Sequence, residues 1–296
     1  MTSKSVAVLG GDKRELIIAA LFEELGCRVR MFGTRADEST RHLVVGSLAE
    51  ALAGAEVLVT PMPGTSGDYG LYAPHAESPL WLDEAALSHV AEGATYFGGR
   101  STPAMQVAGQ ARKMVWMDMG DDDYIQVQHS IPTSEGAISV AIAETAETIH
   151  GANCLVIGYG RIGTVLAADL RGIGADVTVA ARRVEVRARA VAAGHRGTTT
   201  TDEDLAAALS SADIVFVTTS SMVLHPSLLA TVPAGTLVVD LASPPGGLDH
   251  PTAKELGLHV VWARGQADTA AAHSARAQYT FMLDKLGLEL PKSSQR

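Results

Sequence analysis

Cysteine is scarce in this chain, in which only Cys27 and Cys154 occur among 296 residues. Both lie in apolar surroundings, and two such residues provide neither the ligand spacing of a zinc site nor a disulfide framework. We therefore expect two inert core thiols in a cytoplasmic protein, where cysteines stay reduced.

Basic residues and long apolar runs are also few. The chain has 23 Lys and Arg against 33 Asp and Glu, a formal net charge of -10. Nucleic-acid binding depends on clustered Lys and Arg, so this balance disfavours a nucleic-acid partner. No apolar run approaches the ~20 residues that span a bilayer, and residues 1–4 leave no room for a signal peptide before the first strand. We therefore expect neither a membrane nor a nucleic acid as partner.

The residues that are plentiful indicate a folded α/β protein. Hydrophobic residues make up 47% of the chain and charged residues 19%, which excludes wholesale disorder. Short apolar strands alternate with helical patterns in both halves, so we predict two Rossmann-like parallel-sheet domains with an interdomain cleft. The expected parts are a substrate domain over 1–132, a linking helix over 133–150, a nucleotide domain over 151–266 and a C-terminal helix over 267–296 that packs back on the first domain.

The most informative stretch is 153–163, which reads N-C-L-V-I-G-Y-G-R-I-G. Its first residues have the pattern of a buried strand, and the three glycines have the G-x-G-x-x-G spacing of a dinucleotide-binding turn. In such a turn the first glycine allows a sharp bend, the second admits a pyrophosphate, and the third lets the helix approach the sheet. Residues 162–170 continue as a helix and 176–180 as a strand, which completes a βαβ unit.

Two arginines follow the second strand of that unit. Residues 180–183 read A-A-R-R where an NAD-binding unit usually places a carboxylate on the ribose. Arg182 and Arg183 are suited to a 2′-phosphate, so the sequence favours NADP(H) over NAD(H). The alternative is that both arginines lie in a solvated loop.

The chain also opens with a strand, a turn and a helix, over residues 5–9, 10–12 and 14–25. The turn reads G-G-D, lacks the third glycine, and would place Asp12 against a phosphate of like charge. We expect Asp12 to cap the helix instead. A later acidic run, Asp121–Asp123, is interpreted as a solvated turn.

Loops after other predicted strands supply candidate substrate groups, because ligands bind beyond the carboxyl ends of strands in open α/β sheets. Thr65 and Ser66 end a loop that either lines a cleft or is an ordinary connection between two elements. Arg100 and Arg264 could each hold a carboxylate through two hydrogen bonds, although loop arginines are commonly solvated.

Residues 130–136 read S-I-P-T-S-E-G and precede an alanine-rich helical pattern over 137–149. A proline at the opening, Thr133 as N-cap and Glu135 in the first turn predict that a helix begins here. Its amino end would attract an anion, although Glu135 would oppose one placed beside it.

The motifs together resemble the dipicolinate synthase A-subunit family. The resemblance covers most of the chain in order and spacing, and it is carried by G-G-D (10–12), S-I-P-T-S-E-G (130–136), T-I-H-G (148–151), G-Y-G-R-I-G (158–163) and D-L-A-S-P-P-G-G (240–247). The second and last of these are more specific than the glycine turn.

This resemblance implies NADP-linked oxidation of a dihydropyridine dicarboxylate, dihydrodipicolinate, and a flavoprotein-like second subunit. Homodimers or higher homo-oligomers are common for such architectures. The implied substrate side includes Ser130, Thr133 and Glu135, and Asp240, Ala242 and Ser243 are implied beside the nicotinamide. The full predicted cofactor set is Gly158, Tyr159, Gly160, Arg161, Ile162, Gly163, Arg182, Arg183, Thr218, Thr219, Ser220, Asp240, Ala242 and Ser243.

Departures from the family pattern leave other functions open. His129 stands where the family usually has Asn, and the segment 263–274 lacks the Lys of the family loop. The predicted catalytic candidates are His129, Thr133, Glu135, Ser243 and His273, and the histidines could equally be structural. No metal site is expected. The alternatives are a dehydrogenase or reductase of another small imino, amino or hydroxy acid, and a non-catalytic NADPH-binding regulatory subunit.

Overall fold

The computed structural model of this protein describes residues 3–63, 65–263 and 271–289, with the side chains of Thr65 and Ser66 outside that description. The chain folds into two compact units. The first comprises Met1–Gln128 and Ala271–Arg296, and the second comprises His129–Ala270. Each unit has its own parallel sheet and its own apolar core.

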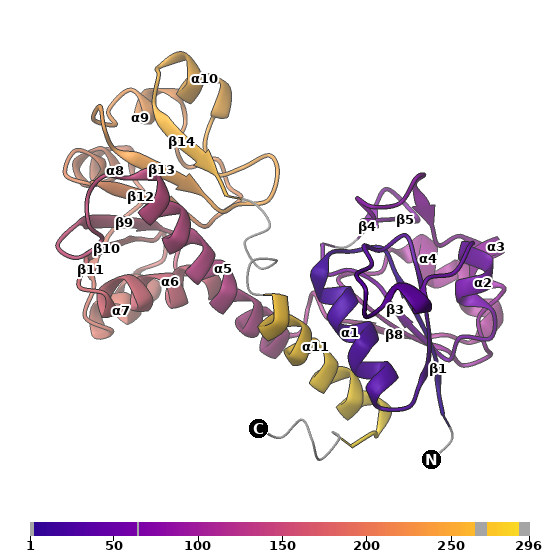
Figure 1. The fold of residues 1–296 in the computed structure, drawn as a ribbon. Helices are drawn as coiled ribbons and strands as arrows, with labels where there is room; N and C mark the ends of the chain where they lie inside the picture. The colour runs from indigo at the N-terminus through magenta and orange to yellow at the C-terminus, as the bar shows by residue number, and fades with distance from the viewer. Residues whose placement is uncertain (1–2, 64, 264–270, 290–296) are drawn as a thin grey trace. The chain divides into compact units, whose positions relative to one another are not determined.

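The first unit is built on a five-stranded parallel sheet with the strand order β2-β1-β3-β7-β8 (Figure 1). The order reverses between β1 and β3, where α/β sheets usually bind ligands. The strands are β1 (Ser5–Leu9), β2 (Arg28–Phe32), β3 (Val57–Val59), β7 (Thr95–Gly98) and β8 (Val115–Asp118). The helices are α1 (Lys13–Glu24), α2 (Leu48–Leu52), α3 (Glu84–Leu87), α4 (Pro103–Ala108) and α11 (Ala271–Leu286), with 3-10 turns η1 (Arg41–Leu43) and η2 (Gln110–Arg112).

The reversal point of this first sheet is covered by the chain itself. A small antiparallel sheet of β4 (Thr65–Ser66), β5 (Gly70–Leu71) and β6 (Leu80–Trp81) follows β3. The Gly11 amide donates to the carbonyl oxygen of Tyr72 at 2.9 Å, and a Cβ atom at Gly10 would lie 2.7 Å from that oxygen. Gly10 therefore admits a neighbouring backbone, and the added Cβ at Gly11 would meet the Glu15 side chain instead.

Asp12 caps α1, which confirms the prediction for this turn. Its side chain accepts from the Arg14 amide at 3.0 Å, and the Glu15 carboxylate accepts from the Asp12 amide at 2.7 Å, forming a capping box. The Arg14 guanidinium also holds both oxygens of Asp12. Burial would raise the pKa of Asp12, but the hydrogen bonds and charge of Arg14 hold it below its usual range.

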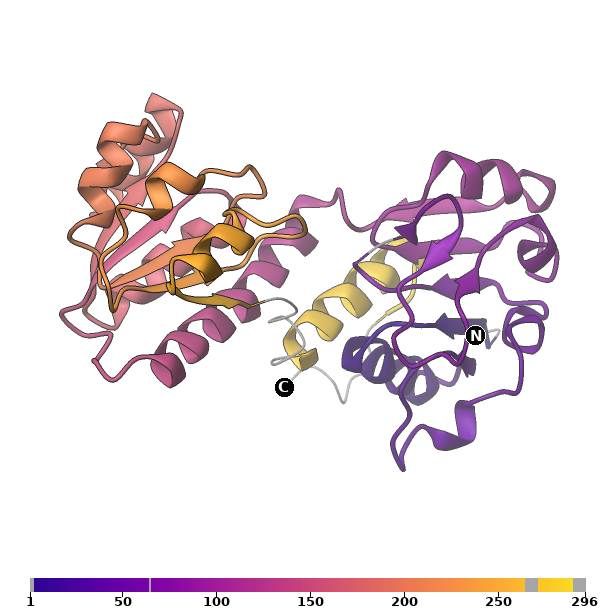
Figure 2. The ribbon, with the colours of Figure 1, turned by 90° about the horizontal axis from the view of Figure 1, so that it is seen from above.

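The C-terminal helix α11 completes the core of the first unit. It lies alongside α1 in both ribbon views (Figures 1 and 2). The Tyr279 ring meets Phe22 edge to face with centroids 5.0 Å apart, and its hydroxyl donates to the Leu21 carbonyl. Met282 and Leu283 are buried in the same cluster. The last helix in the sequence is thus needed to bury the first.

The helix predicted over 137–149 is instead α5 (Asp123–Glu144), so the expected boundaries were wrong at both ends. The helix starts early because Asp122 accepts a hydrogen bond from the Ile125 amide at 3.0 Å, as an N-cap does. The run Asp121–Asp123 is therefore a helix start rather than a solvated turn. Pro132 lies inside the helix, where it removes one hydrogen-bond donor.

Thr133 consequently caps nothing. Its hydroxyl donates to the carbonyl oxygen of His129, one turn earlier, at 2.8 Å. The expected anion site at a helix start beside Thr133 and Glu135 does not exist, because the amides there lie within the helix.

The second unit contains a six-stranded parallel sheet with the order β11-β10-β9-β12-β13-β14. This is the doubly wound order of dinucleotide-binding domains, with its reversal between β9 and β12. The strands are β9 (Asn153–Ile157), β10 (Asp176–Ala180), β11 (Arg196–Thr198), β12 (Ile214–Val217), β13 (Leu237–Asp240) and β14 (His259–Trp262). The helices are α6 (Arg161–Gly172), α7 (Val184–Ala192), α8 (Asp202–Leu209), α9 (Pro226–Leu229) and α10 (His250–Glu255). The predicted α/β class with two Rossmann-like parallel sheets is confirmed.

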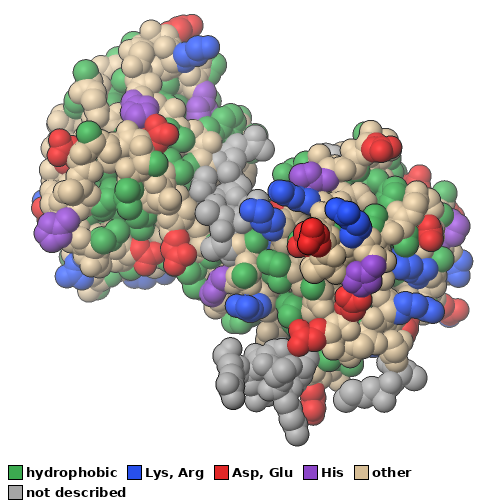
Figure 3. Space-filling model, in the orientation of Figure 1, with side chains coloured by type: hydrophobic (Ala, Val, Ile, Leu, Met, Phe, Trp, Pro, Cys, Tyr) green, Lys and Arg blue, Asp and Glu red, His purple; other side chains and the backbone are tan. Residues whose placement is uncertain are grey.

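The described surface is mixed in character. On the face drawn in Figure 3, Lys and Arg side chains are interspersed with Asp and Glu side chains. Among the described helices, none combines the length and the apolar composition that crossing a bilayer requires.

Candidate functional site

Four loops of the second unit meet at one edge of its sheet. The strand register pairs Ile157 with Ala180 and with Val217, and Val217 with Asp240. The residues that follow these strand ends are therefore neighbours: the glycine turn at 158–160, the arginines after β10, the polar residues at 218–221 and the loop at 241–247. This edge contains the reversal point of the sheet, the usual position for a nucleotide.

Glycine occupies the three positions of the turn for different physical reasons. Gly158 has φ +101°, and a Cβ atom there would lie 2.5 Å from the Thr218 hydroxyl oxygen. A Cβ atom at Gly163 would lie 2.1 Å from the Gly158 carbonyl oxygen. At Gly160 no atom of the described residues lies within 4 Å of an added Cβ, and its φ of -84° suits any residue. The protein itself therefore requires the first and third glycines but not the second.

Gly160 is also the N-cap of α6, where no side chain accepts a hydrogen bond from the first amides. The first turn carries no acidic residue, and it begins with the exposed Arg161 and the half-buried Ile162. The amino end of this helix thus lacks a competing side-chain cap, and its dipole favours an anion.

The loop after β10 that carries Arg182 and Arg183 is held in place by a residue of α7. Arg182 and Arg183 are both exposed, and Arg183 lies 3.5 Å from Glu185 in an exposed pair. Arg187 donates through one guanidinium nitrogen to the carbonyl oxygens of Ala181 and Arg182, at 2.8 and 2.7 Å. The backbone of this loop is therefore tied down while its two arginine side chains face solvent.

Other predicted cofactor residues have partners within the unit. The half-buried Tyr159 ring packs against the core and meets His195 edge to face, with ring centroids 6.1 Å apart. The Thr218 hydroxyl donates to the Ile157 carbonyl at 3.1 Å, and the Thr219 hydroxyl accepts from the Ser221 amide. Ser220 is exposed.

The loop after β13 is fixed by Asp240, which is fully buried. One carboxylate oxygen accepts from the Ala242 amide at 2.9 Å, and the other accepts from the Gly247 amide at 3.0 Å. Ser243 is exposed at the tip of this loop. The Asp240 carboxylate therefore faces its own loop, and Ser243 is the polar side chain among the exposed residues 243–245 of that loop.

The predicted residues on α5 differ in exposure. Ser130 is buried, Thr133 is half-buried and Glu135 is exposed. Ser134, which was not singled out from the sequence, is fully buried and donates to the Asp169 carboxylate of α6 at 2.7 Å. This contact joins the S-I-P-T-S-E-G segment to the helix that follows the glycine turn.

Three predicted side chains belong to the first unit or to the helix that enters it. Arg100 pairs with Asp121 at 2.6 Å, with both side chains mostly exposed. His273 contacts the Gln128 side-chain oxygen at 2.9 Å. His129 is half-buried on α5. The side chains of Thr65 and Ser66, and the whole of Arg264, lie outside the described residues.

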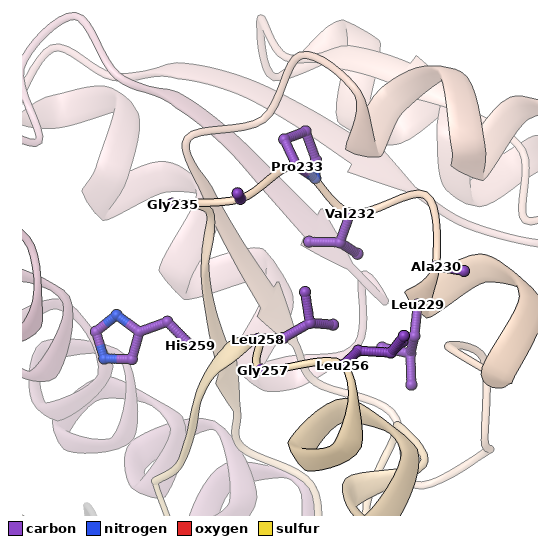
Figure 4. Close-up of a pocket in the computed structure, with 10 residues that line it drawn as sticks. Leu229, Ala230, Val232, Pro233, Gly235, Leu256, Gly257, Leu258 and His259 are labelled. Carbon is purple, nitrogen blue, oxygen red and sulfur yellow. The ribbon is translucent and has the colours of Figure 1, made fainter.

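A hollow of about 250 Å³ lies at the opposite edge of the second sheet (Figure 4). It is bounded by residues 229–235, before β13, and 256–259, at the start of β14. The lining residues are mainly aliphatic but expose as much polar as apolar surface, and His259, the titratable residue among them, pairs with Glu144 at 3.1 Å. This hollow is separate from the loops that follow the strands.

Reasoning from the sequence missed Arg187, Ser134 and also His250, whose Nε2 lies 2.8 Å from an oxygen of the buried Asp240 carboxylate. Their roles depend on contacts with residues 5 to 35 positions away, which periodicity and motif spacing do not report.

Comparisons with known proteins agree with this geometry. Residues 5–119 match the model of the N-terminal domain of the dipicolinate synthase A subunit, and 141–248 match that of shikimate / quinate 5-dehydrogenase. The chain is 30% identical over 294 residues to the A subunit of dipicolinate synthase from Bacillus subtilis (strain 168), covering 98% of each.

Solved structures extend the likeness to the fold. The dipicolinate synthase A chain from Bacillus subtilis superposes with a TM-score of 0.81 at 27% identity, covering 97% of both chains. The A subunit of dipicolinate synthase from Bacillus halodurans also gives a TM-score of 0.81, at 25% identity over 98% of this chain and all of that one. With a dehydrogenase-type nucleotide scaffold behind a matching N-terminal domain, this chain belongs to the dipicolinate synthase A-subunit family.

Proposed function

We propose that this protein is an NADP-dependent oxidoreductase that converts a dihydropyridine dicarboxylate, dihydrodipicolinate, to the pyridine dicarboxylate. The reaction removes one hydride and one proton from the ring and leaves an aromatic product. When bound, the nicotinamide nucleotide supplies the hydride acceptor. The protein then has to orient the ring, hold two carboxylates and accept the proton.

The observation that carries this proposal is Gly160. Within the part of the chain that the structure describes, no atom lies within 4 Å of a Cβ added at Gly160, and the backbone conformation there does not call for glycine. Glycine here is explained by a group that approaches from outside the chain, at an uncapped helix start. A pyrophosphate at this turn fits both facts.

NADP rather than NAD is proposed from the arginine loop. Arg182 and Arg183 are exposed beyond the end of β10, and residues 180–183 contain no carboxylate that would bind a ribose hydroxyl. Two guanidinium groups at this place are suited to a 2′-phosphate, which a carboxylate would repel.

The substrate side is proposed from the family resemblance and the remaining candidates. Ser130 and Thr133 on α5, with Thr65 and Ser66, would supply hydroxyl groups, and Arg100 and Arg264 would bind carboxylates. Proton transfer is assigned to a group among His129, Glu135 and His273, with Ser243 beside the reacting ring.

Turnover of dihydrodipicolinate is the direct test. Purified protein is mixed with NADP⁺ and this substrate, and the nicotinamide absorbance is followed with and without a flavoprotein-like second subunit. Growth of the reduced-nicotinamide band supports the proposal. NADPH binding in a titration without turnover under either condition would favour the regulatory alternative, and the absence of any nucleotide binding would contradict the proposal entirely.

A second candidate substrate class follows from the Arg100–Asp121 pair. An arginine already neutralised by a carboxylate at 2.6 Å holds a second carboxylate less well. A small imino, amino or hydroxy acid with one carboxylate would need fewer cations. The same assay with such acids in place of dihydrodipicolinate discriminates between the two classes.

A further inference from the structure

His250 donates to the buried carboxylate that shapes the loop after β13. Its Nε2 lies 2.8 Å from an Asp240 oxygen that also accepts from the Gly247 amide. With the Ala242 amide on the other oxygen, the fully buried carboxylate has three partners. His250 is the only one of the three that comes from outside the loop, because it begins α10.

A second contact ties the same histidine to the neighbouring strand. The His250 ring stacks on the Trp262 ring with centroids 4.2 Å apart and an angle of 22° between their planes. The Trp262 indole N–H donates to the Ala242 carbonyl at 2.9 Å. His250 is thus linked to both ends of the loop through Asp240 and to the end of β14 through Trp262.

The loop leaves little room around this cluster. Gly246 has φ +101°, and a Cβ atom there would lie 2.8 Å from both the Asp240 carboxylate and the His250 ring nitrogen. The Gly246 amide also closes the tip of the loop by donating to the Ser243 carbonyl at 2.9 Å. The shape around Ser243 therefore depends on the Asp240 and His250 side chains staying in place.

We propose that His250 is a positioning residue which, through Asp240 and Trp262, holds loop 241–247 in the shape that presents Ser243 to the nicotinamide end of the bound nucleotide. This inference rests on the proposed function. In this role His250 acts through Asp240 and Trp262, so its effect is on the fraction of molecules whose loop is correctly shaped.

Comparison with other histidine–carboxylate pairs of the second unit shows why this one matters. His225 pairs with Asp202 at 3.0 Å and His259 with Glu144 at 3.1 Å, but these carboxylate side chains are 71% and 44% exposed. The Asp240 side chain is 0% exposed. Water replaces a lost partner at the exposed pairs, whereas the buried Asp240 carboxylate would keep only its two backbone donors and gain no water in place of His250.

The test compares three variants of the full chain. His250→Leu removes the donor, His250→Gln retains a side-chain N–H of similar reach, and His225→Leu is the matched control at an exposed pair. The loss of a charge-assisted hydrogen bond changes an equilibrium constant, here that between correctly and incorrectly shaped loops, by a factor of roughly ten to one hundred. We expect His250→Leu to lower kcat by about that factor, while its NADPH affinity stays within about threefold of that of the unmodified protein. His250→Gln should recover most of kcat. His225→Leu should resemble the unmodified protein in both quantities.

Trp262 supplies a readout that does not depend on turnover. The other two tryptophans, Trp81 and Trp116, belong to the first unit, so changing both to Phe leaves Trp262 as the only tryptophan. We expect His250→Leu in this background to change Trp262 emission in the absence of nucleotide, because the stacked ring is gone, and His225→Leu to leave it unchanged. If His250→Leu does not fold, His250→Gln is compared with the shorter His250→Asn, which cannot reach Asp240 and should lose both kcat and the native emission.

The results separate this inference from the proposed function. If the unmodified protein neither binds NADPH nor turns over, the proposed function fails first. If it is active and His250→Leu keeps kcat within about twofold, or if His250→Gln is impaired as much as His250→Leu, the positioning role is overturned.

Discussion

Gly160 differs from the other two glycines of its turn, because nothing in the protein requires a glycine there. We predict that Gly160→Ala leaves thermal unfolding unchanged or raises the stability by about 0.5 kcal/mol, since Ala restricts the unfolded chain. The same variant should weaken NADPH binding, measured by fluorescence titration, because the new methyl group occupies the approach of the pyrophosphate.

Gly163→Ala is the matched control. Its Cβ would lie 2.1 Å from the Gly158 carbonyl oxygen, so the turn has to shift and thermal stability should fall. Unaltered NADPH affinity in Gly160→Ala would remove the main support for a nucleotide at this turn.

Glu15 makes the stability of the first unit depend on pH. Burial raises the pKa of this fully buried carboxyl group from its ordinary 4.5 to about 7, with the negative Asp12 adding to the effect and Arg14 opposing it. Between these values the folded protein keeps a proton that the unfolded chain has lost. Stability is therefore complete below about pH 4.5 and falls by up to ~3 kcal/mol as the pH rises through 7.

Urea unfolding of the unmodified protein and of Glu15→Gln at about pH 5 and pH 8 checks this prediction. Gln keeps an oxygen that accepts from the Asp12 amide but does not ionise, so the decline attributed to this site should disappear. An equal decline in both proteins would assign the pH dependence to other groups.

At the scale of single elements, the loop between β10 and α7 decides between the two nicotinamide nucleotides. We predict that replacing Arg182 and Arg183 together by Ser weakens NADPH binding at least tenfold more than NADH binding, because charge-assisted hydrogen bonds of about 1.5–3 kcal/mol each are lost. Isothermal titration with both nucleotides measures the difference. Equal weakening of the two would show that these side chains do not bind a 2′-phosphate.

Arg187 provides the control for that experiment. It holds the loop backbone through two carbonyl oxygens and is not among the exposed arginines. Arg187→Met should disturb the loop itself and weaken both nucleotides to a similar degree.

The α5 helix shows how far element boundaries follow from sequence. Its proline, threonine and glutamate have the composition of a helix start, yet the helix begins ten positions before Thr133. Asp122 supplies an earlier cap, and burial of Ile125 in the first unit stabilises the extra turns. Capping signals are local, and the choice between two competing caps is made by packing.

At the scale of the whole molecule, the two units are not two consecutive halves of the sequence, because the C-terminal helix α11 completes the core of the first unit. We predict that Tyr279→Ala lowers the stability of that unit by about 3–5 kcal/mol, since the buried ring packs on Phe22. Urea unfolding in a Trp262→Phe background, where Trp81 and Trp116 of the first unit are the remaining tryptophans, measures this loss. Titration with NADPH should remain near that of the unmodified protein, because the glycine turn lies in the second unit.

Tyr124→Ala is the control for this change. Tyr124 is 52% exposed on α5, and its removal should shift stability by no more than about 0.5 kcal/mol. A similar loss from both variants would indicate that α11 does not contribute specifically to the core.

The sequence alone determined the fold class, the glycine turn, the Asp12 cap and the family, because each depends on residues close together in the chain or on motifs read in order. Only the tertiary structure decided that the reversal point of the first sheet is covered by Tyr72, that Pro132 lies within a helix, and that Asp240 joins His250. These contacts join residues that only folding brings together. Burial decides which of the possible contacts form, and local sequence patterns do not record burial.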